Sequence, residues 1–275
     1  MKKQILILGV FLMPFCAYAE DAELPSCGEN CTYTIENNVL TIKPIDLSQP
    51  ANVGKYISCS TTECHSEAPW FGKGVSKVVV SDGVTSIGNG AFYSMGSVTS
   101  IELPEGLQTI GSSAFEATNI TSVNLPSTVT SLGTYAFAYT QLENINGIPE
   151  GVTELTFRSF CNTKLESLIV PESVTTVSAD IFGGNDEWHS QALITNIYCA
   201  ESIADQCARA LQWKGDSAKV IPYQITSNGQ VFYNNKWYDS ANDILSNNYA
   251  KKRIYTIDEA NKVSGRKNTF KIRYK

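Results

Sequence analysis

The residues best suited to chemistry are few and lie far apart along the chain. The 275 residues include two histidines, His65 and His189, and eight cysteines. A catalytic Cys–His pair would have to use Cys64 beside His65, but adjacent side chains rarely face each other. Cys64 also has Cys59 five residues before it, and such a pair is oxidised in an oxidising compartment. Structural zinc needs four ligands, whereas Cys59, Cys64 and His65 supply three. The sequence therefore predicts no catalytic residue, no metal site and no cofactor.

Motifs for nucleotide chemistry or hydrolysis are also missing from the sequence. It contains no phosphate-binding loop, no Gly-x-Ser-x-Gly nucleophile elbow and no dinucleotide fingerprint. The acidic run at 185–187 lacks the alternating spacing of a calcium loop. We therefore expect a protein that is not an enzyme and has no nucleic-acid partner, with an extracellular hydrolase of unfamiliar site as an open alternative.

Five phenylalanines recur at nearly constant spacing and predict the architecture that any site must use. They are 23, 22, 23 and 22 residues apart, and each ends the pattern L-x-x-I-x-L-P-x-x-V-x-x-I-G-x-x-A-F. The period is typical of leucine-rich repeats, and the alternation in I-x-L predicts a short strand. We expect Pro to end this strand, Gly to permit a tight bend, and Phe to stack in a column inside the coil. The column consists of Phe92, Phe115, Phe137, Phe160 and Phe182.

The repeats predict a β-rich, right-handed solenoid with minor helix, in which about five repeats of 22 to 23 residues align their strands in one parallel sheet. The open ends of such a stack need covering elements. We expect a signal peptide at 1–19, an N-terminal β cap at 20–74, the solenoid at 75–197, a terminal cap with a short helix at 198–219, and a basic C-terminal module at 220–275.

The repeat motifs resemble the treponemal-type leucine-rich repeats of BspA-like bacterial surface proteins. The resemblance rests on VTSIGNGAF at 84–92, IELPEGLQTIGSSAF at 101–115 and VNLPSTVTSLGTYAF at 123–137. CGENCTYTIENNVLTI at 27–42 and APWFGKGVSKVVV at 68–80 are similar to the family's amino-terminal lead-in. The resemblance implies a secreted or surface-exposed binding protein, often associated with adhesion, and it supplies no catalytic residues.

The amino-terminal segment has the pattern of a secretory signal. Lys2 and Lys3 precede an apolar stretch at 5–15, and Ala17-Tyr18-Ala19 forms an A-x-A cleavage site. No later stretch approaches the length of a membrane span. We therefore expect a secreted or cell-surface protein that is cleaved near Ala19.

Export would permit disulfides among the cysteines of the mature chain. Their spacing suggests three local pairs, but six cysteines allow 15 connectivities, so the pairing stays open. Cys161 follows a column phenylalanine, and we interpret it as a small buried apolar side chain rather than a reactive thiol. The disulfide candidates are Cys27, Cys31, Cys59, Cys64, Cys199 and Cys207.

Charge divides the chain into two parts. Residues 20–212 hold 7 basic against 22 acidic residues, whereas residues 213–275 hold 12 against 5. The basic module could meet an anionic surface, dock onto the acidic solenoid, or simply face water. This leaves an alternative function in which the repeats are a structural spacer and the module is a sorting or envelope-attachment signal.

Three local patterns predict elements outside the repeats. Alternating residues around Asn37-Asn38 predict a hairpin in the cap. An apolar face over 202–211 predicts a short helix. Asn234-Asn235, between two aromatic-rich runs, predicts a second hairpin.

The leading hypothesis places binding on the concave face of the strands, with protein or glycan partners at a host or neighbouring cell surface. Outward residues of successive strands should align in rows, and extended faces of this kind are where solenoids usually bind. The insertion at 183–193 predicts a loop that either contributes to binding or is a simple bulge. A merely solvated sheet is the alternative for the strand face. The candidate partner-binding residues are Thr99, Glu102, Thr121, Asn124, Glu143, Asn146, Glu166, Ile169 and Trp188.

Overall fold

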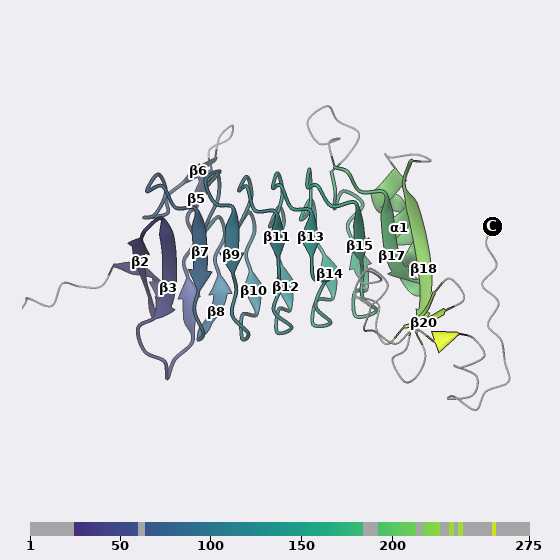
Figure 1. Cartoon of the computed structure of the whole chain (residues 1–275), viewed down its shortest axis with the longest axis horizontal. Helices are drawn as coiled ribbons and strands as arrows, with labels where there is room; N and C mark the ends of the chain where they lie inside the picture. Colours follow the sequence, from purple (N-terminus) through teal and green to yellow (C-terminus); the bar gives the residue numbers. More distant parts are fainter. Residues whose placement is uncertain are drawn as a thin grey trace, which may run out of the picture.

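The structure is a computed structural model that shows a stack of similar coils along one long axis (Figure 1). The amino-terminal strands lie at one end of the stack, and a helix with longer strands lies at the other. The residues that the structure describes are 25–59, 64–183, 192–212, 217–225, 231–233, 236–238 and 255–256.

Each coil contributes two short strands, so the strands form two parallel ladders rather than the single sheet expected from the sequence. The V-x-x-I segment of the repeat forms the additional strand. The first ladder contains β7 (Lys77–Val80), β9 (Ser100–Glu102), β11 (Ser122–Val123), β13 (Asn144–Ile145), β15 (Ser167–Ile169), β17 (Asn196–Ala200) and β18 (Lys219–Ile225). The second ladder contains β8 (Val84–Ile87), β10 (Thr109–Ile110), β12 (Ser131–Leu132), β14 (Glu154–Leu155) and β16 (Thr176–Val177).

Pairing along the ladders is strictly in register but comes in blocks. In the first ladder β7 pairs with β9, β11 with β13, and β15 with β17 and β18. In the second ladder β8, β10 and β12 are continuous, and β14 pairs with β16. Side chains of one repeat position therefore stack on the same position of the next coil, as the sequence period requires.

The amino-terminal strands join the two ladders at one end of the stack. These strands are β1 (Ser26–Glu29), β2 (Cys31–Glu36), β3 (Val39–Pro44) and β4 (Ala51–Val53). They complete a nine-stranded sheet of order β12-β10-β8-β4-β1-β2-β3-β7-β9. The β2–β3 turn places Asn37 and Asn38 at φ of 51° and 64°, the left-handed geometry of a two-residue hairpin, which confirms the predicted hairpin.

A short hairpin lies beside this cap, and a helix covers the opposite end of the coils. β5 (Ile57–Cys59) and β6 (Cys64–Ser66) form a hairpin near the cap. At the other end, η1 (Glu201–Ile203) leads into α1 (Ala204–Leu211), which confirms the predicted helix. The Gln206 side chain accepts a hydrogen bond from the Val177 amide and donates to the Thr175 carbonyl, both at 2.9 Å, so the helix caps the last strand of the second ladder.

The strands after β18 pair antiparallel. They are β19 (Val231–Tyr233), β20 (Lys236–Tyr238) and β21 (Tyr255–Thr256). β19 pairs with β20, and β20 pairs with β21. The pairing of β19 with β20 confirms the second predicted hairpin, although its turn at 234–235 lies outside the described residues.

Disulfides appear at both ends of the coil stack. Cys27 is bonded to Cys31 in the cap, and Cys199 of β17 is bonded to Cys207 of α1, which confirms two of the three local pairs. Cys64 is also disulfide-bonded, and it lies opposite Cys59 in the β5–β6 register, while the Cys59 side chain is outside the described part. Cys161 is completely buried, as interpreted from its position in the repeat.

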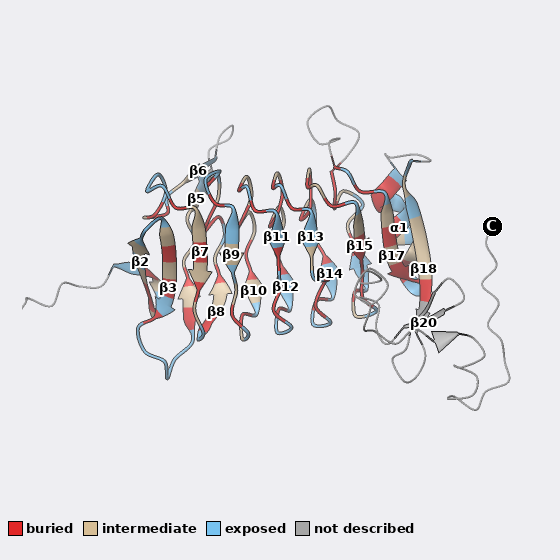
Figure 2. Ribbon diagram, viewed as in Figure 1, coloured by how far each residue is buried: buried red, intermediate tan, exposed pale blue. Residues whose placement is uncertain are grey.

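The column of phenylalanines is fully buried in the core of the coils. Figure 2 shows buried segments, in red, that recur from coil to coil along the stack. Ring centroids of Phe92 and Phe115 are 5.1 Å apart, those of Phe115 and Phe137 are 5.4 Å apart, and those of Phe137 and Phe160 are 5.8 Å apart. Trp70 stacks on Phe92 at 5.7 Å and donates its indole N–H to the Ala91 carbonyl at 2.9 Å. Trp70 therefore starts the column.

The glycine that recurs in the first three repeat copies serves close stacking and not the tight bend that the sequence suggested. Gly88, Gly111 and Gly133 have no left-handed φ. A Cβ added to Gly111 would lie 2.6 Å from Asn89 Oδ1 and 2.7 Å from the Asn89 backbone nitrogen of the preceding coil. The glycine is needed because two backbones approach each other at this point.

Three threonines that follow the column phenylalanines are buried but satisfied. Thr118, Thr140 and Thr163 each donate their hydroxyl to the carbonyl three residues earlier, at 2.8, 2.9 and 3.1 Å. A buried hydroxyl is costly without such a partner. These bonds therefore let polar residues repeat inside the core.

Candidate functional site on the first ladder

The structure places most of the predicted binding residues at the surface. Trp188 lies outside the described residues, and Ile169 is buried. The exposed candidates are Thr99, Glu102, Thr121, Asn124, Glu143, Asn146 and Glu166. The predicted row of outward-facing side chains therefore exists, but some of these side chains have partners within the fold and others do not.

The assignment of Ile169 to the exposed row was wrong. Its side chain is only 1% exposed and belongs to the hydrophobic core. In the ladder register Ile169 lies opposite Tyr198, and Tyr198 lies opposite Ile221. The outward row thus becomes apolar at this end of the ladder, and burying those side chains removes apolar surface from water.

Two predicted residues are already engaged by the fold. The Asn146 side chain accepts a hydrogen bond from the Leu125 amide at 2.8 Å and donates to the Leu125 carbonyl at 3.1 Å, as a paired strand would. Glu102 forms an ion pair with Lys77 of the neighbouring strand, with Nζ and Oε1 2.5 Å apart. Both residues are exposed, but their polar atoms have structural partners.

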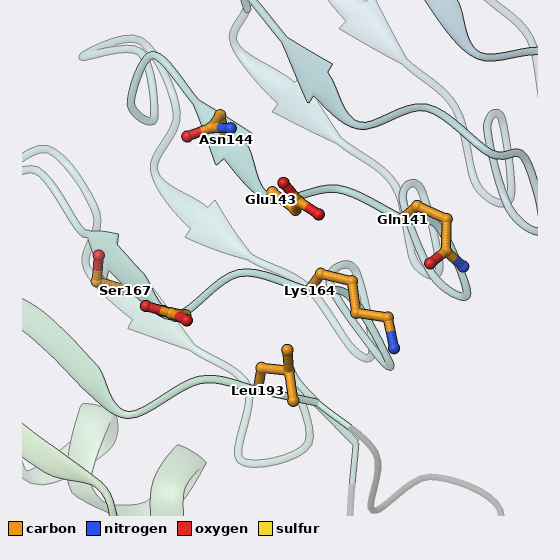
Figure 3. A pocket seen from close by; sticks show the side chains of 7 residues that line it. Gln141, Glu143, Asn144, Lys164, Ser167 and Leu193 are labelled. Atoms are coloured by element: carbon orange, nitrogen blue, oxygen red, sulfur yellow. The ribbon is translucent and has the colours of Figure 1, made fainter.

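Glu143 and Glu166 lie together in a depression on the first ladder (Figure 3). Its volume is about 700 Å³. Figure 3 shows that its side chains come from two successive coils and from the segment before β17. The lining residues are Gln141, Glu143, Asn144, Lys164, Glu166, Ser167 and Leu193.

Five of these lining residues were not predicted from the sequence. Asn144 and Ser167 begin β13 and β15, one residue beyond the positions chosen from the repeat pattern. Gln141 and Lys164 occupy equivalent positions in the preceding turns, and Leu193 is 46% exposed. Aligning the repeat copies could have identified all five, because Gln141, Lys164 and Leu193 each precede the first apolar residue of a copy.

The depression lies where the first ladder is interrupted. In the described sheets β13 pairs only with β11, and β15 pairs with β17. The fourth repeat copy carries one extra residue, Gly147, which adopts a φ of 122° that favours glycine. The depression therefore adjoins both the extra residue after β13 and the missing β13–β15 pairing.

The chemistry of the depression is hydrogen bonding and charge. Glu143 and Glu166 supply carboxylates, Lys164 an ammonium group, and Asn144 an amide, from residues that are exposed or half-buried. These groups can bind a polar partner without moving backbone. Within the described residues there is no group of three or more His, Cys, Asp or Glu side chains placed to hold a metal ion.

A smaller depression adjoins the edge where the strands of the first ladder end. It has a volume of about 280 Å³, and Glu105, Ser127 and Glu150 contribute to its lining. Ser127 donates its hydroxyl to Glu105 at 3.0 Å. Burial raises the pKa of Glu150, and the nearby Glu172 carboxylate adds to this effect. The edge is therefore acidic, but part of its polar capacity is used internally.

The repeat pattern and the two ladders identify the family of the coils. Six copies of the BspA type leucine rich repeat region match residues 70–188. Residues 70–188 are BspA-type leucine-rich repeats. The match begins at Trp70, the residue that starts the aromatic column, which confirms the resemblance seen in the sequence.

Solved structures of bacterial leucine-rich repeat proteins are similar to this chain. A leucine-rich repeat protein from Eubacterium ventriosum is 21% identical, with a TM-score of 0.52, over 76% of this chain and 47% of that one. The pneumococcal vaccine antigen PcpA is 18% identical, with a TM-score of 0.40, over 75% of this chain and 53% of its own. The chain thus spans about half the length of these proteins, and the first likeness supports the fold alone.

Two further comparisons complete the description. No curated protein matches the chain. Among the described residues, none of the helices has both the length and the apolar character required to cross a bilayer.

Proposed function

We propose that the protein is a non-enzymatic binding protein, secreted or displayed at a cell surface, that recognises protein or glycan partners through the first ladder. BspA-type repeats, which are typically found in surface or secreted proteins, support this proposal. The two described disulfide pairs fit an oxidising, extracellular setting. Adhesion is the activity that such a surface serves.

The observation that carries the proposal is the polar depression between β13 and β15. Its carboxylates are not used by the ladder hydrogen bonds, in contrast to the side chain of Asn146. Exposed polar groups held on a rigid stack can bind without paying a large ordering cost. Two carboxylates against one ammonium group favour a partner that is neutral or that presents hydrogen-bond donors.

The test uses the full mature chain on a printed glycan array and on a panel of immobilised extracellular matrix proteins. The double variant Glu143→Gln, Glu166→Gln removes both carboxylates of the depression. We expect it to weaken binding by about tenfold or more, because a few central residues carry most of the binding energy of an interface.

The matched control is Glu154→Gln. Glu154 is an exposed glutamate on β14 of the second ladder. It should leave binding unchanged. Equal loss in the control and the double variant, or unchanged binding in both, would contradict recognition by the first ladder.

A further inference from the structure

In the turn before the column phenylalanine, two repeat copies carry residues that depart from the repeat pattern. The proposed function does not involve these residues. In the repeat pattern G-x-x-A-F, the two x positions lie between the glycine and the residue before the phenylalanine. In most copies this pair consists of small residues, and in the third and fourth copies it contains bulky ones. The pairs are Asn89-Gly90, Ser112-Ser113, Thr134-Tyr135, Phe157-Arg158 and Ala179-Asp180.

The backbone of this turn favours small residues. The second residue of the pair is left-handed in four copies, with φ of 65° at Gly90, 56° at Ser113, 57° at Tyr135 and 54° at Arg158. Glycine adopts this conformation freely, whereas a bulky residue there is uncommon and strained. The backbone conformation of this turn thus does not call for Tyr135 or Arg158, and residues held in costly conformations tend to cluster at functional sites.

These bulky residues contact one another across two successive coils. The rings of Tyr135 and Phe157 meet edge to face, with centroids 5.6 Å apart. The Arg158 guanidinium lies over the Phe157 ring at 4.9 Å and over the Tyr135 ring at 6.0 Å. Its Nη1 donates to the Tyr135 hydroxyl at 3.4 Å. We call Tyr135, Phe157 and Arg158 the aromatic–arginine cluster.

The aromatic–arginine cluster is accessible and nearly rigid. Phe157 is 39% exposed, and Tyr135 and Arg158 are half-buried. The ring contacts fix the guanidinium, so little side-chain entropy remains to be lost on binding. Tyr139 lies nearby, since Arg158 and Tyr135 both influence the pKa of its hydroxyl, which burial raises.

Charge and ring geometry indicate the kind of partner. Between residues 84 and 183 the chain has two basic residues, Arg158 and Lys164, among many acidic ones. A fixed guanidinium pairs well with a carboxylate. A sugar would need an open aromatic face, but the guanidinium covers one face of Phe157 and Tyr135 meets that ring edge to face. Arg and aromatic residues are instead typical of the energetic centre of protein interfaces.

We propose that the aromatic–arginine cluster is a second recognition surface, distinct from the first ladder, which binds a protein segment carrying an acidic side chain flanked by apolar residues. The acidic side chain pairs with Arg158. The apolar neighbours pack against Phe157 and Tyr135.

The experiment pans a phage-displayed random peptide library on the immobilised full mature chain. Enriched peptides should carry Asp or Glu beside apolar residues. Their affinity should fall by about tenfold or more in Phe157→Ser and in Arg158→Ser, as expected for central interface residues. The double variant Glu143→Gln, Glu166→Gln is the control, and it should bind these peptides normally, which separates this surface from the first ladder.

Thermal unfolding of the same variants tests the structural alternative. Serine occupies both positions in the second copy, so the double variant Phe157→Ser, Arg158→Ser should melt within about 3 °C of the parent chain or above it. Arg158→Lys, which keeps the charge but loses the planar fork, should still lose most peptide binding.

Three outcomes would overturn the proposal. The first is a library that enriches no peptide on the parent chain over the double serine variant. The second is a large fall in melting temperature of that variant, because it would show that the cluster serves the fold. The third is binding of acidic glycans on an array that depends on Arg158, which would assign the surface to a different class of ligand.

Discussion

The second and fourth repeat copies share one core but differ at their surfaces. Both bury a column phenylalanine and a hydrogen-bonded threonine. The second copy keeps the glycine of the repeat and a pair of serines after it, whereas the fourth has Thr156, Phe157 and Arg158 there and an extra Gly147 after its strand. Core packing thus fixes the buried residues that every coil must contain. Surface residues that depart from the repeat mark the coils that have an additional role.

Both candidate surfaces involve the fourth copy. The depression includes side chains before and within β13, and the aromatic–arginine cluster spans the turns that follow β12 and β14. The regular copies contribute mainly small or polar residues at the same positions. Substitutions at equivalent positions of the two copies can therefore separate scaffold from function.

The largest expected effect comes from the phenylalanine column. Phe115→Ala removes a fully buried ring that stacks on both neighbours, and it should lower the free energy of unfolding by about 3–5 kcal/mol. Phe157→Ala in the fourth copy should cost about 1 kcal/mol or less, because only ring contacts at the surface are lost. Urea unfolding followed by circular dichroism measures both, and similar losses would contradict the distinction between the two copies.

The second expected effect comes from backbone stacking at the glycine position. Gly111→Ala should destabilise the chain by about 1–3 kcal/mol, because the added methyl group meets the backbone of the preceding coil. Thr156→Ala, at the same position of the fourth copy, should cost only about 1 kcal/mol through its hydrogen bond to the Leu132 carbonyl. Calorimetry would show the order, and a harmless Gly111→Ala would reject the stacking role of the glycine.

A third, smaller effect tests whether the same buried hydrogen bond contributes equally to stability in the second and the fourth copy. Thr118→Val and Thr163→Val each remove one buried hydroxyl bond, at 2.8 and 3.1 Å, in the second and fourth copies. Each should cost about 1 kcal/mol in the free energy of unfolding. Unequal losses in chemical denaturation would mean that the irregular surface of the fourth copy extends into its core.

The smallest effect is a pH dependence in the second copy. Burial raises the pKa of the Glu116 carboxyl above its ordinary value of 4.5. A raised folded-state pKa favours the protonated form, so the contribution of this group to stability is complete below the unfolded pKa and is lost as pH rises through the folded pKa. Glu116→Gln should therefore raise the melting temperature at pH 7, and the gain should disappear below about pH 4.

Exposed Glu154 supplies the matched substitution for this last measurement. Glu154→Gln should give a smaller change between the two pH values, since its side chain is solvated on β14. A gain for Glu116→Gln that is constant with pH would exclude ionisation of this carboxyl as the cause.

Much of the core could be predicted from the sequence, because each position of the repeat recurs once per coil and stacks on the same position of the next coil. The phenylalanine spacing predicted the column, and alternation predicted the strands of the first ladder. The second ladder was missed because V-x-x-I has a spacing of three, which does not indicate a strand by alternation. The role of Gly111 was also misjudged, since local sequence does not show how closely the neighbouring coil approaches.

The candidate surfaces were less predictable, for physical reasons that differ between residues. Glu143 and Glu166 were predicted from the repeat. Lys164 and Leu193 also occupy a repeated position, but the sequence does not show that the two side chains line one depression. Tyr135 and Arg158 carried a sequence signal that was overlooked, because they replace small residues at an equivalent turn position. Their left-handed backbone, which makes that replacement informative, is visible only in the structure.

The cap that links the two ladders also affects how such a protein can grow and associate. Because β1 to β4 run continuously from one ladder to the other, the described residues at that end of the stack offer no unpaired strand to another chain. Self-association by strand addition is blocked there. Lengthening the array therefore requires inserting coils between this end and the helix-capped end. The first coil must keep its pairing with β3 and β4, whereas inner coils are free to diversify.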